Sequence, residues 1–167
     1  MTHKTHLVGG VVLAGIVHQH FFTMTEVQFA CYYAGALIGS LLPDIDHPKS
    51  LISQTVVFLH YPFSKLGHRK ATHSLLAVII CMGLMYLLFG NNYIGLGLGI
   101  GYSSHLLLDM LNPRGVPLLY PFIRYKYKIG NIHTGEKGEE IIYFILLVSL
   151  LIIIVKGMGP FVEGLLR

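Results

Sequence analysis

Five apolar stretches, separated by polar segments, constrain this chain more than any other feature of its sequence. A helix that crosses a bilayer needs about 20 mostly apolar residues. The clearest stretch is IIYFILLVSLLIII, and another, YIGLGLGIGYSSHLLLDML, carries the glycines and serines that allow close helix packing in lipid. The sequence therefore predicts an all-α, polytopic membrane bundle of about five spans, at roughly residues 5–22, 26–43, 73–90, 93–111 and 139–156.

The composition favours a membrane protein over the alternative, a very apolar soluble helical protein. Only 12% of the residues are charged and 53% are hydrophobic, with a mean hydropathy of +0.63, whereas soluble domains are about a quarter charged. We expect residues 1–167 to form a single membrane-embedded domain. The first stretch lacks a small-residue cleavage site, so we expect it to be retained. The piece LISQTVVFLHYPF is too short to span and predicts a short interfacial helix.

Polar motifs rich in histidine and aspartate stand at the ends of the first four stretches. His6 lies at the start of the first, LPDIDHP ends the second, GHRKATHS begins the third, and SHLLLDMLNPRG ends the fourth. Because consecutive spans alternate in direction, these four ends lie on the same side of the membrane. The other side would hold only Lys156 and Arg167 of the 12 Lys and Arg residues. By the positive-inside rule, the motifs are therefore predicted to face the cytoplasm.

These motifs contain all of the aspartates and several of the histidines of the chain. Ionisable groups at the edge of the hydrocarbon are costly unless they are paired or bind a metal ion. His105 and Asp109 are four residues apart and share one face of a helix. Asp44 and Asp46 flank Ile45, and an extended turn there would point both carboxylates the same way. The candidate metal ligands are His6, Asp44, Asp46, His47, His68, His73, His105 and Asp109, with His47 either a ligand or a partner of one.

This set of side chains indicates the chemistry that such a site would perform. Histidine and aspartate without cysteine favour zinc, manganese or iron(II) over a thiolate site, and the set leaves room for one to three ions. Two closely spaced metals commonly hydrolyse phosphate esters. The sequence predicts a metal-activated water with Asp46 or Asp109 as the catalytic base. Arg69, Lys70 and Arg114 would bind the substrate phosphate. The alternative is a buried polar network that only pins the helices together.

Two further polar features are expected to be structural. Thr72 and Ser74 directly precede the third stretch, and we expect them to cap its helix. The run GEKGEE, before the fifth stretch, is expected to be a solvated loop.

On these motifs the chain resembles the YdjM-like family of bacterial inner-membrane proteins, described as membrane-bound metal-dependent hydrolases and including a LexA-regulated member. The matching pieces are THLVGG, LLPDIDHPKS, GHRKATHSLLAV and GYSSHLLLDMLNPRGVPLLYP. The resemblance implies a helical fold in the bacterial cytoplasmic membrane and a metal site built from the candidate ligands named above. Lys70 and Ala71 stand where the family often has glycine and a bulky aromatic residue. In ligand types only, the pattern is also similar to zinc-dependent phospholipase C.

The function expected from these features is that of an integral-membrane, metal-dependent hydrolase that cleaves a phosphoester of a lipid or lipid-linked substrate at the cytoplasmic face. Its expected partners are the bilayer, a lipid or phosphorylated substrate, and a divalent ion, zinc before manganese or iron; no nucleic acid is expected. Phospholipid, lysolipid, isoprenoid phosphate and nucleotide remain open as substrates, as does the oligomeric state. The alternatives are a divalent-metal transporter and a regulatory protein with a structural metal. Few ionisable groups lie within the second to fourth stretches, which argues against transport.

Overall fold

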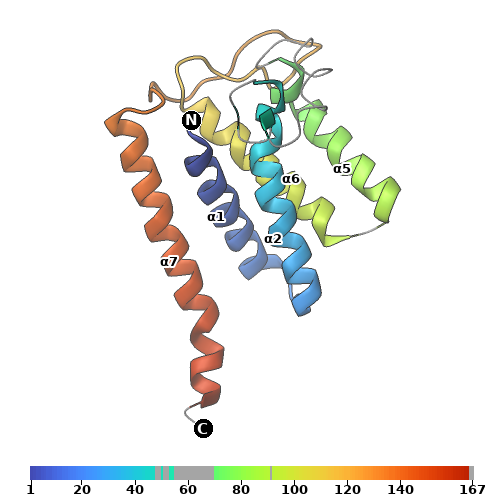
Figure 1. The fold of residues 1–167 in the computed structure, drawn as a ribbon, viewed down its shortest axis with the longest axis vertical. Coiled ribbons are helices and arrows are strands. Elements are labelled where there is room, and N and C mark those ends of the chain that lie inside the picture. Colours follow the sequence, from blue (N-terminus) through green and yellow to red (C-terminus); the bar gives the residue numbers. More distant parts are fainter. Residues whose placement is uncertain (48–49, 51–52, 55–69, 91, 166–167) are drawn as a thin grey trace.

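The computed structural model describes residues 1–47, 50, 53–54, 70–90 and 92–165, the last eight of these by their backbone only. In this part of the chain the structure is helical, and no strand longer than an isolated bridge forms. The all-α prediction is confirmed, and each predicted stretch coincides with one helix (Figure 1). The elements are α1 (His3–Phe21), α2 (Glu26–Leu41), η1 (Leu42–Asp46), η2 (Ala71–His73), α5 (Leu75–Phe89), α6 (Tyr93–Met110) and α7 (Lys137–Leu165).

One helix in the described ranges, α7 over Lys137–Gly157, is long and apolar enough to cross a membrane by length and composition. Helix α5 is equally apolar in character but shorter, at 15 residues. The prediction of five spans therefore stays a prediction at this point. The predicted interfacial helix, at residues 51–63, lies almost entirely outside the described residues.

Helices α2 and α6 form the most extensive contact of the bundle, and α1 packs against both. Helix α5 covers another side of α6, and α7 leans on α1 and extends past the other helices (Figure 1). Glycines allow the close contact of α2 with α6. A Cβ at Gly97 would lie 1.9 Å from the carbonyl oxygen of Tyr32, and one at Gly101 would lie 2.0 Å from that of Ala36. The close packing predicted for the glycine-rich stretch is confirmed.

Polar side chains fix where the helices begin. Thr25 and Gln28 form a reciprocal capping box at the start of α2. The Ser74 hydroxyl accepts the backbone N–H of Ala77 at the start of α5, as predicted, and Asn92 accepts that of Gly95 at the start of α6. The Ser74 cap lies within the motif GHRKATHS, whereas Thr25 and Asn92 cap the ends of α2 and α6 that lie away from the polar motifs.

The outer faces of α5 and α7 are apolar and exposed. Ile79 and Leu87 on α5 are 66% and 81% exposed, and Leu151 on α7 is 61% exposed. Soluble monomers rarely expose contiguous apolar surfaces of this kind. Both helices therefore need an apolar environment around the protein.

Candidate functional site

Five potential metal donors from four separate segments meet at one end of the bundle, where the first turn of α1 and the last turn of α6 adjoin η1 and η2. Four of the five are at most 1% exposed at the side chain, and the fifth, Asp44, is 23% exposed. We call these side chains the donor cluster; its members are His6, Asp44, His73, His105 and Asp109.

Helix α6 supplies two members of the donor cluster from one face. His105 and Asp109 are four residues apart, and the His105 Nε2 atom lies 3.8 Å from Asp109 Oδ2. The His6 ring stacks on the His105 ring with centroids 3.6 Å apart, and its Nε2 atom lies 3.4 Å from Asp109 Oδ1. The start of α1 is thereby fixed against the end of α6.

The orientation of His105 is set by the neighbouring helix. Its Nδ1 atom lies 2.7 Å from the carbonyl oxygen of Ser40, the last turn of α2. A carbonyl only accepts, so Nδ1 carries the proton and Nε2 of the neutral ring carries a lone pair. That lone pair faces Asp44 Oδ1 at 3.7 Å and Asp109 Oδ2 at 3.8 Å. Three electron-rich atoms thus face one another, which is favourable only with a cation between them.

A second histidine has the same arrangement. The Thr72 hydroxyl donates its single hydrogen to Asp46 Oδ2 at 2.7 Å, so it accepts from His73 Nδ1 at 3.0 Å. His73 Nε2 then points toward Asp44 Oδ1 at 3.7 Å and Asp109 Oδ2 at 3.6 Å. Metal-ligating histidines typically donate their other ring N–H in this way, which holds the ring orientation.

The spacing of the donor cluster fits a single small cation. Its ion-pair distances run from 3.4 Å to 3.8 Å, too long for hydrogen bonds. Two ligand atoms bound at about 2.0–2.2 Å to one tetrahedral ion stand roughly 3.3–3.6 Å apart. The donors form two groups that share His105: His6, Asp44 and His105 in one, and His73, His105 and Asp109 in the other. His105 has only one lone pair, on Nε2, with which to bind an ion. A single shared ion therefore fits this geometry more simply than two separate ions.

Buried ring nitrogens in the cluster support the same interpretation. Within the described residues, both ring nitrogens of His6 and Nε2 of His105 are buried without a hydrogen-bond partner. A buried polar atom without a partner costs about 1–3 kcal/mol. A metal ion removes that cost because it coordinates the lone pairs directly.

Asp44 in η1 and His73 in η2, which lie beyond the ends of the α-helices, are electrostatically coupled. Burial alone would raise the pKa of Asp44, but the nearby His73, His105 and His6 outweigh it and hold the pKa below its usual range. Burial alone would lower the pKa of His73, but Asp109 and Asp44 outweigh it and raise the pKa. Asp44 therefore stays ionised and attracts a cation, whereas Asp109 Oδ1 already accepts from the N-terminal ammonium of Met1 at 2.8 Å.

Two predicted ligands, Asp46 and His47, lie outside both donor groups. The segment was expected to be an extended turn, but η1 is a 3₁₀ helix. Residues two apart on a 3₁₀ helix point in different directions, because each residue turns the chain by about 120°. Asp44 therefore faces the donor cluster while buried Asp46 accepts from Thr72, and His47 ends η1. The prediction of aligned carboxylates is wrong for this reason.

The remaining predicted site residues are not part of the donor cluster as described. His68 and Arg69 lie outside the described residues. Lys70 is exposed and directly precedes η2, and Arg114 is exposed in the loop that follows α6. Both stand within a few residues of a cluster member along the chain.

One residue that supports the site was missed. Glu139 was expected to lie in a solvated loop, but it is 3% exposed in the first turn of α7. Its Oε1 atom accepts hydrogen bonds from the Thr2 N–H and the Thr5 hydroxyl, and Oε2 accepts from the Gly135 N–H. Glu139 thereby ties α7 to the residues just before His6. A position in the first helical turn, where a carboxylate is favoured, is the signal that could have identified it.

Comparisons with known proteins identify the family of the chain. A model of the family described as YdjM inner membrane protein matches residues 1–161. The chain is 35% identical over 153 residues to inner membrane protein YdjM of Escherichia coli (strain K12), covering 87% of this chain and 77% of that protein. It is 33% identical over 144 residues to uncharacterized protein YvsG of Bacillus subtilis (strain 168), covering 85% of this chain and 87% of that protein. No solved structure matches. The chain therefore belongs to the YdjM inner membrane protein family.

Proposed function

We propose that this chain is an integral protein of the bacterial inner membrane whose five helices cross the bilayer, with the donor cluster at the cytoplasmic face. Family membership and the exposed apolar faces of α5 and α7 support this placement. The loop between α6 and α7, at the same end as the donor cluster, carries four exposed cations (Figure 1). Short loops rich in Lys and Arg face the cytoplasm. These cations are Arg114, Arg124, Lys126 and Lys128.

In this proposal the donor cluster binds a divalent ion, zinc in preference to manganese or iron. The orientation of His105 carries the proposal, since its Nδ1 donates to Ser40 and its Nε2 faces two carboxylates. Imidazole and carboxylate donors without thiolates are typical of catalytic zinc and of non-haem iron sites.

The proposed reaction is hydrolysis of a phosphoester. A divalent ion supplies Lewis-acid polarisation of a phosphoryl oxygen and lowers the pKa of a coordinated water. Asp46 is enclosed by its hydrogen bond to Thr72 and Asp109 is fully buried. Asp44, the one partly exposed member of the cluster, is better placed to accept a proton from an approaching water. The exposed Lys70 and Arg114, with Arg69, would bind the phosphate.

A structural metal site is the second candidate, and the near-complete burial of four donors favours it. Structural sites are closed, whereas catalytic sites keep an open position. The 23% exposure of Asp44 supports the catalytic candidate, because water can reach that side of the cluster. Transport has less support, because the donor groups found in the described ranges lie at one end of the bundle.

Metal content and phosphoester hydrolysis, measured on one purified preparation, test the proposal. Asp44→Asn changes the most exposed donor and is the variant least apt to disturb folding. His133→Ala is the control, because His133 lies in the α6–α7 loop and is 54% exposed. We expect elemental mass spectrometry to find bound zinc in the wild type and the control, and less in Asp44→Asn.

Phosphate release from phosphatidic acid, and headgroup release from phosphodiester lipids, should follow the metal content. Bound metal without turnover of either lipid class would support the structural site instead. A wild-type protein that binds no zinc, manganese or iron after reconstitution would refute the proposal.

A further inference from the structure

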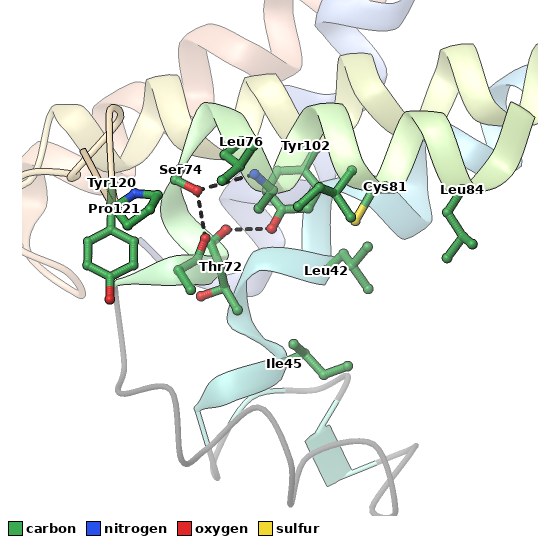
Figure 2. A pocket seen from close by; sticks show the side chains of 13 residues that line it. Leu42, Ile45, Thr72, Ser74, Leu76, Cys81, Leu84, Tyr102, Tyr120 and Pro121 are labelled. Carbon is green, nitrogen blue, oxygen red and sulfur yellow. Dashed lines mark hydrogen bonds between the residues drawn. The ribbon is translucent and has the colours of Figure 1, made fainter. Parts of the chain in front are cut away.

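A cavity of about 540 Å³ opens beside the donor cluster, between η1, η2, α5 and α6. Its volume lies within the range of about 300–1,000 Å³ that is typical of small-molecule sites. Nearly all of its wall is apolar (Figure 2). We call this cavity the chain groove, and the wall residues used below are Ile45, Thr72, Ala77, Ile80, Cys81 and Leu84.

The chain groove and the donor cluster share one wall. Ile45 lines the groove and lies between Asp44 and Asp46 in η1. Thr72 lines the groove, and its hydroxyl contacts both Asp46 and the Nδ1 atom of His73. A ligand in the groove therefore has one end within a residue or two of the proposed metal ligands.

The hydroxyl hydrogens of Thr72, Ser74 and Tyr102, near that end, are already donated within the protein. Thr72 bonds to Asp46 and His73, Tyr102 donates to the carbonyl of Thr72, and Ser74 donates to Ala71 and accepts from Ala77. Figure 2 shows the bonds of Tyr102 and Ser74 near η2, with Leu42, Ile45 and Leu84 farther along the cavity. Because nearly all of the wall is apolar, a sugar or a nucleobase would lose most of its hydrogen bonds to water here, at a cost of about 1–3 kcal/mol for each unsatisfied group. The complementary ligand is a hydrocarbon.

The outer wall of the groove continues into the exposed apolar face of α5. Ile80 and Leu84 line the groove and are 59% and 50% exposed, and Leu87 follows on the same helix at 81%. If α5 faces the bilayer, a lipid chain reaches the groove sideways without crossing water. The phosphate of that lipid would then lie at the helix ends, next to Asp44 and the exposed Lys70.

We propose that the chain groove binds a hydrocarbon chain of the substrate, so that the substrate is a membrane lipid bearing a phosphoester and not a nucleotide or another water-soluble phosphate. The position of the phosphate rests on the proposed function, whereas the binding of a hydrocarbon chain rests only on the residues that line the groove. For short-chain, water-soluble analogues, whose chains move from water into the groove, each added methylene should raise the affinity about fourfold until the groove is full.

Photolabelling tests the groove without relying on turnover. The protein would be placed in phosphatidylcholine nanodiscs that contain a small fraction of phosphatidic acid with a diazirine in its acyl chain. We expect peptide mass spectrometry to find labels concentrated on groove residues such as Cys81, in excess over the exposed face of α7 around Leu151.

Two substitutions on α5 form a matched pair for this measurement. Ala77→Phe fills the groove, whereas Leu87→Phe adds an aromatic ring on the exposed face outside it. Because the added ring takes up groove volume, most of the groove labelling should be lost in Ala77→Phe, and Leu87→Phe should label as the wild type does. Two results would refute hydrocarbon binding in the groove. One is a wild-type protein whose labels spread evenly over α5 and α7. The other is an Ala77→Phe protein that melts normally and keeps the wild-type groove labelling.

The groove and the hydrolase proposal fail in different ways. Labelling in the groove of Asp44→Asn should persist at the wild-type level, because that variant alters a donor and not the apolar wall. Groove labelling without hydrolysis of any phosphoester would refute the enzyme and keep the hydrocarbon site. Equal turnover of phosphatidic acid and of a water-soluble aryl phosphate would keep the enzyme and refute the lipid specificity.

Discussion

Replacing Gly101 with alanine tests whether the close α2–α6 contact sets the geometry of the donor cluster. Gly101 lies about one turn before His105 on α6. A Cβ at this position would stand 2.0 Å from the carbonyl oxygen of Ala36, whereas ordinary van der Waals contact begins at 3.4 Å. The two helices must therefore part by about 1.4 Å along that line. The Nδ1–O bond from His105 to Ser40, 2.7 Å in the structure, would then exceed the hydrogen-bonding range.

Two quantities should change together in Gly101→Ala. Overpacking of this kind costs about 1–3 kcal/mol in the free energy of unfolding. Loss of the partner that orients a ligating histidine typically lowers metal affinity by about 10–100-fold. Gly83→Ala on α5 is the matched control, because a Cβ there meets nothing within 4 Å. Alanine is the better helix former, so this control should be neutral or more stable by up to about 1 kcal/mol.

Thermal unfolding in detergent and a zinc titration against a chromogenic chelator measure the two effects on the same samples. We expect Gly101→Ala to melt earlier and to bind zinc more weakly, and Gly83→Ala to do neither. A Gly101→Ala protein with the wild-type melting temperature would refute the packing argument. Earlier melting with unchanged zinc affinity would refute the link between the helix contact and the donor cluster.

Three further changes test other contacts around the cluster. Glu139→Gln removes the charge that three donors share, so unfolding should become easier by about 1–3 kcal/mol, whereas exposed Glu140→Gln should have no effect in the same thermal assay. Thr72→Val breaks the contacts to Asp46 and His73, so zinc affinity should fall by about tenfold or more. Thr72→Ser keeps the hydroxyl and should bind zinc as the wild type does. Equal zinc affinities of the Val and Ser variants would contradict the role of the hydroxyl. If zinc is bound at 100 times its Kd, its removal with a chelator should lower the free energy of unfolding of the wild type by about 2.7 kcal/mol and so lower the melting temperature. The chelator should lower the melting temperature of Asp44→Asn by less than that of the wild type. An equal decrease in the two proteins would mean that the metal binds away from Asp44.

Much of the fold could be predicted because apolar runs and glycines act locally. Each predicted stretch became a helix, since its length and composition suffice to define it. The glycine-rich stretch also predicted close helix packing, because glycines such as Gly97 and Gly101 allow another backbone to approach, but the partner, α2, is seen only in the structure. The pairing of His105 with Asp109 followed from helical geometry alone.

Features that depend on contacts between distant segments could not be predicted. Glu139 stands in a run of charges that is typical of a solvated loop, and its burial depends on Thr2 and Thr5 at the other end of the chain. Thr72 has the residue type and position of a helix cap, yet its hydroxyl bonds Asp46 across 26 positions of sequence. The spacing of two residues between Asp44 and Asp46 suits an extended strand or a 3₁₀ turn equally well, and only the fold decides between them.

The helix packing and the chemistry of this protein depend on the same contact. Because α2 approaches α6 closely at its glycines, the carbonyl of Ser40 can accept the Nδ1 proton of His105. Because that proton is held there, the other ring nitrogen offers its lone pair toward Asp44 and Asp109. The glycines would therefore be as much a part of the proposed metal site as the donors, although none of them belongs to the donor cluster. A relative that keeps every donor but carries bulkier residues along this contact should bind the metal poorly.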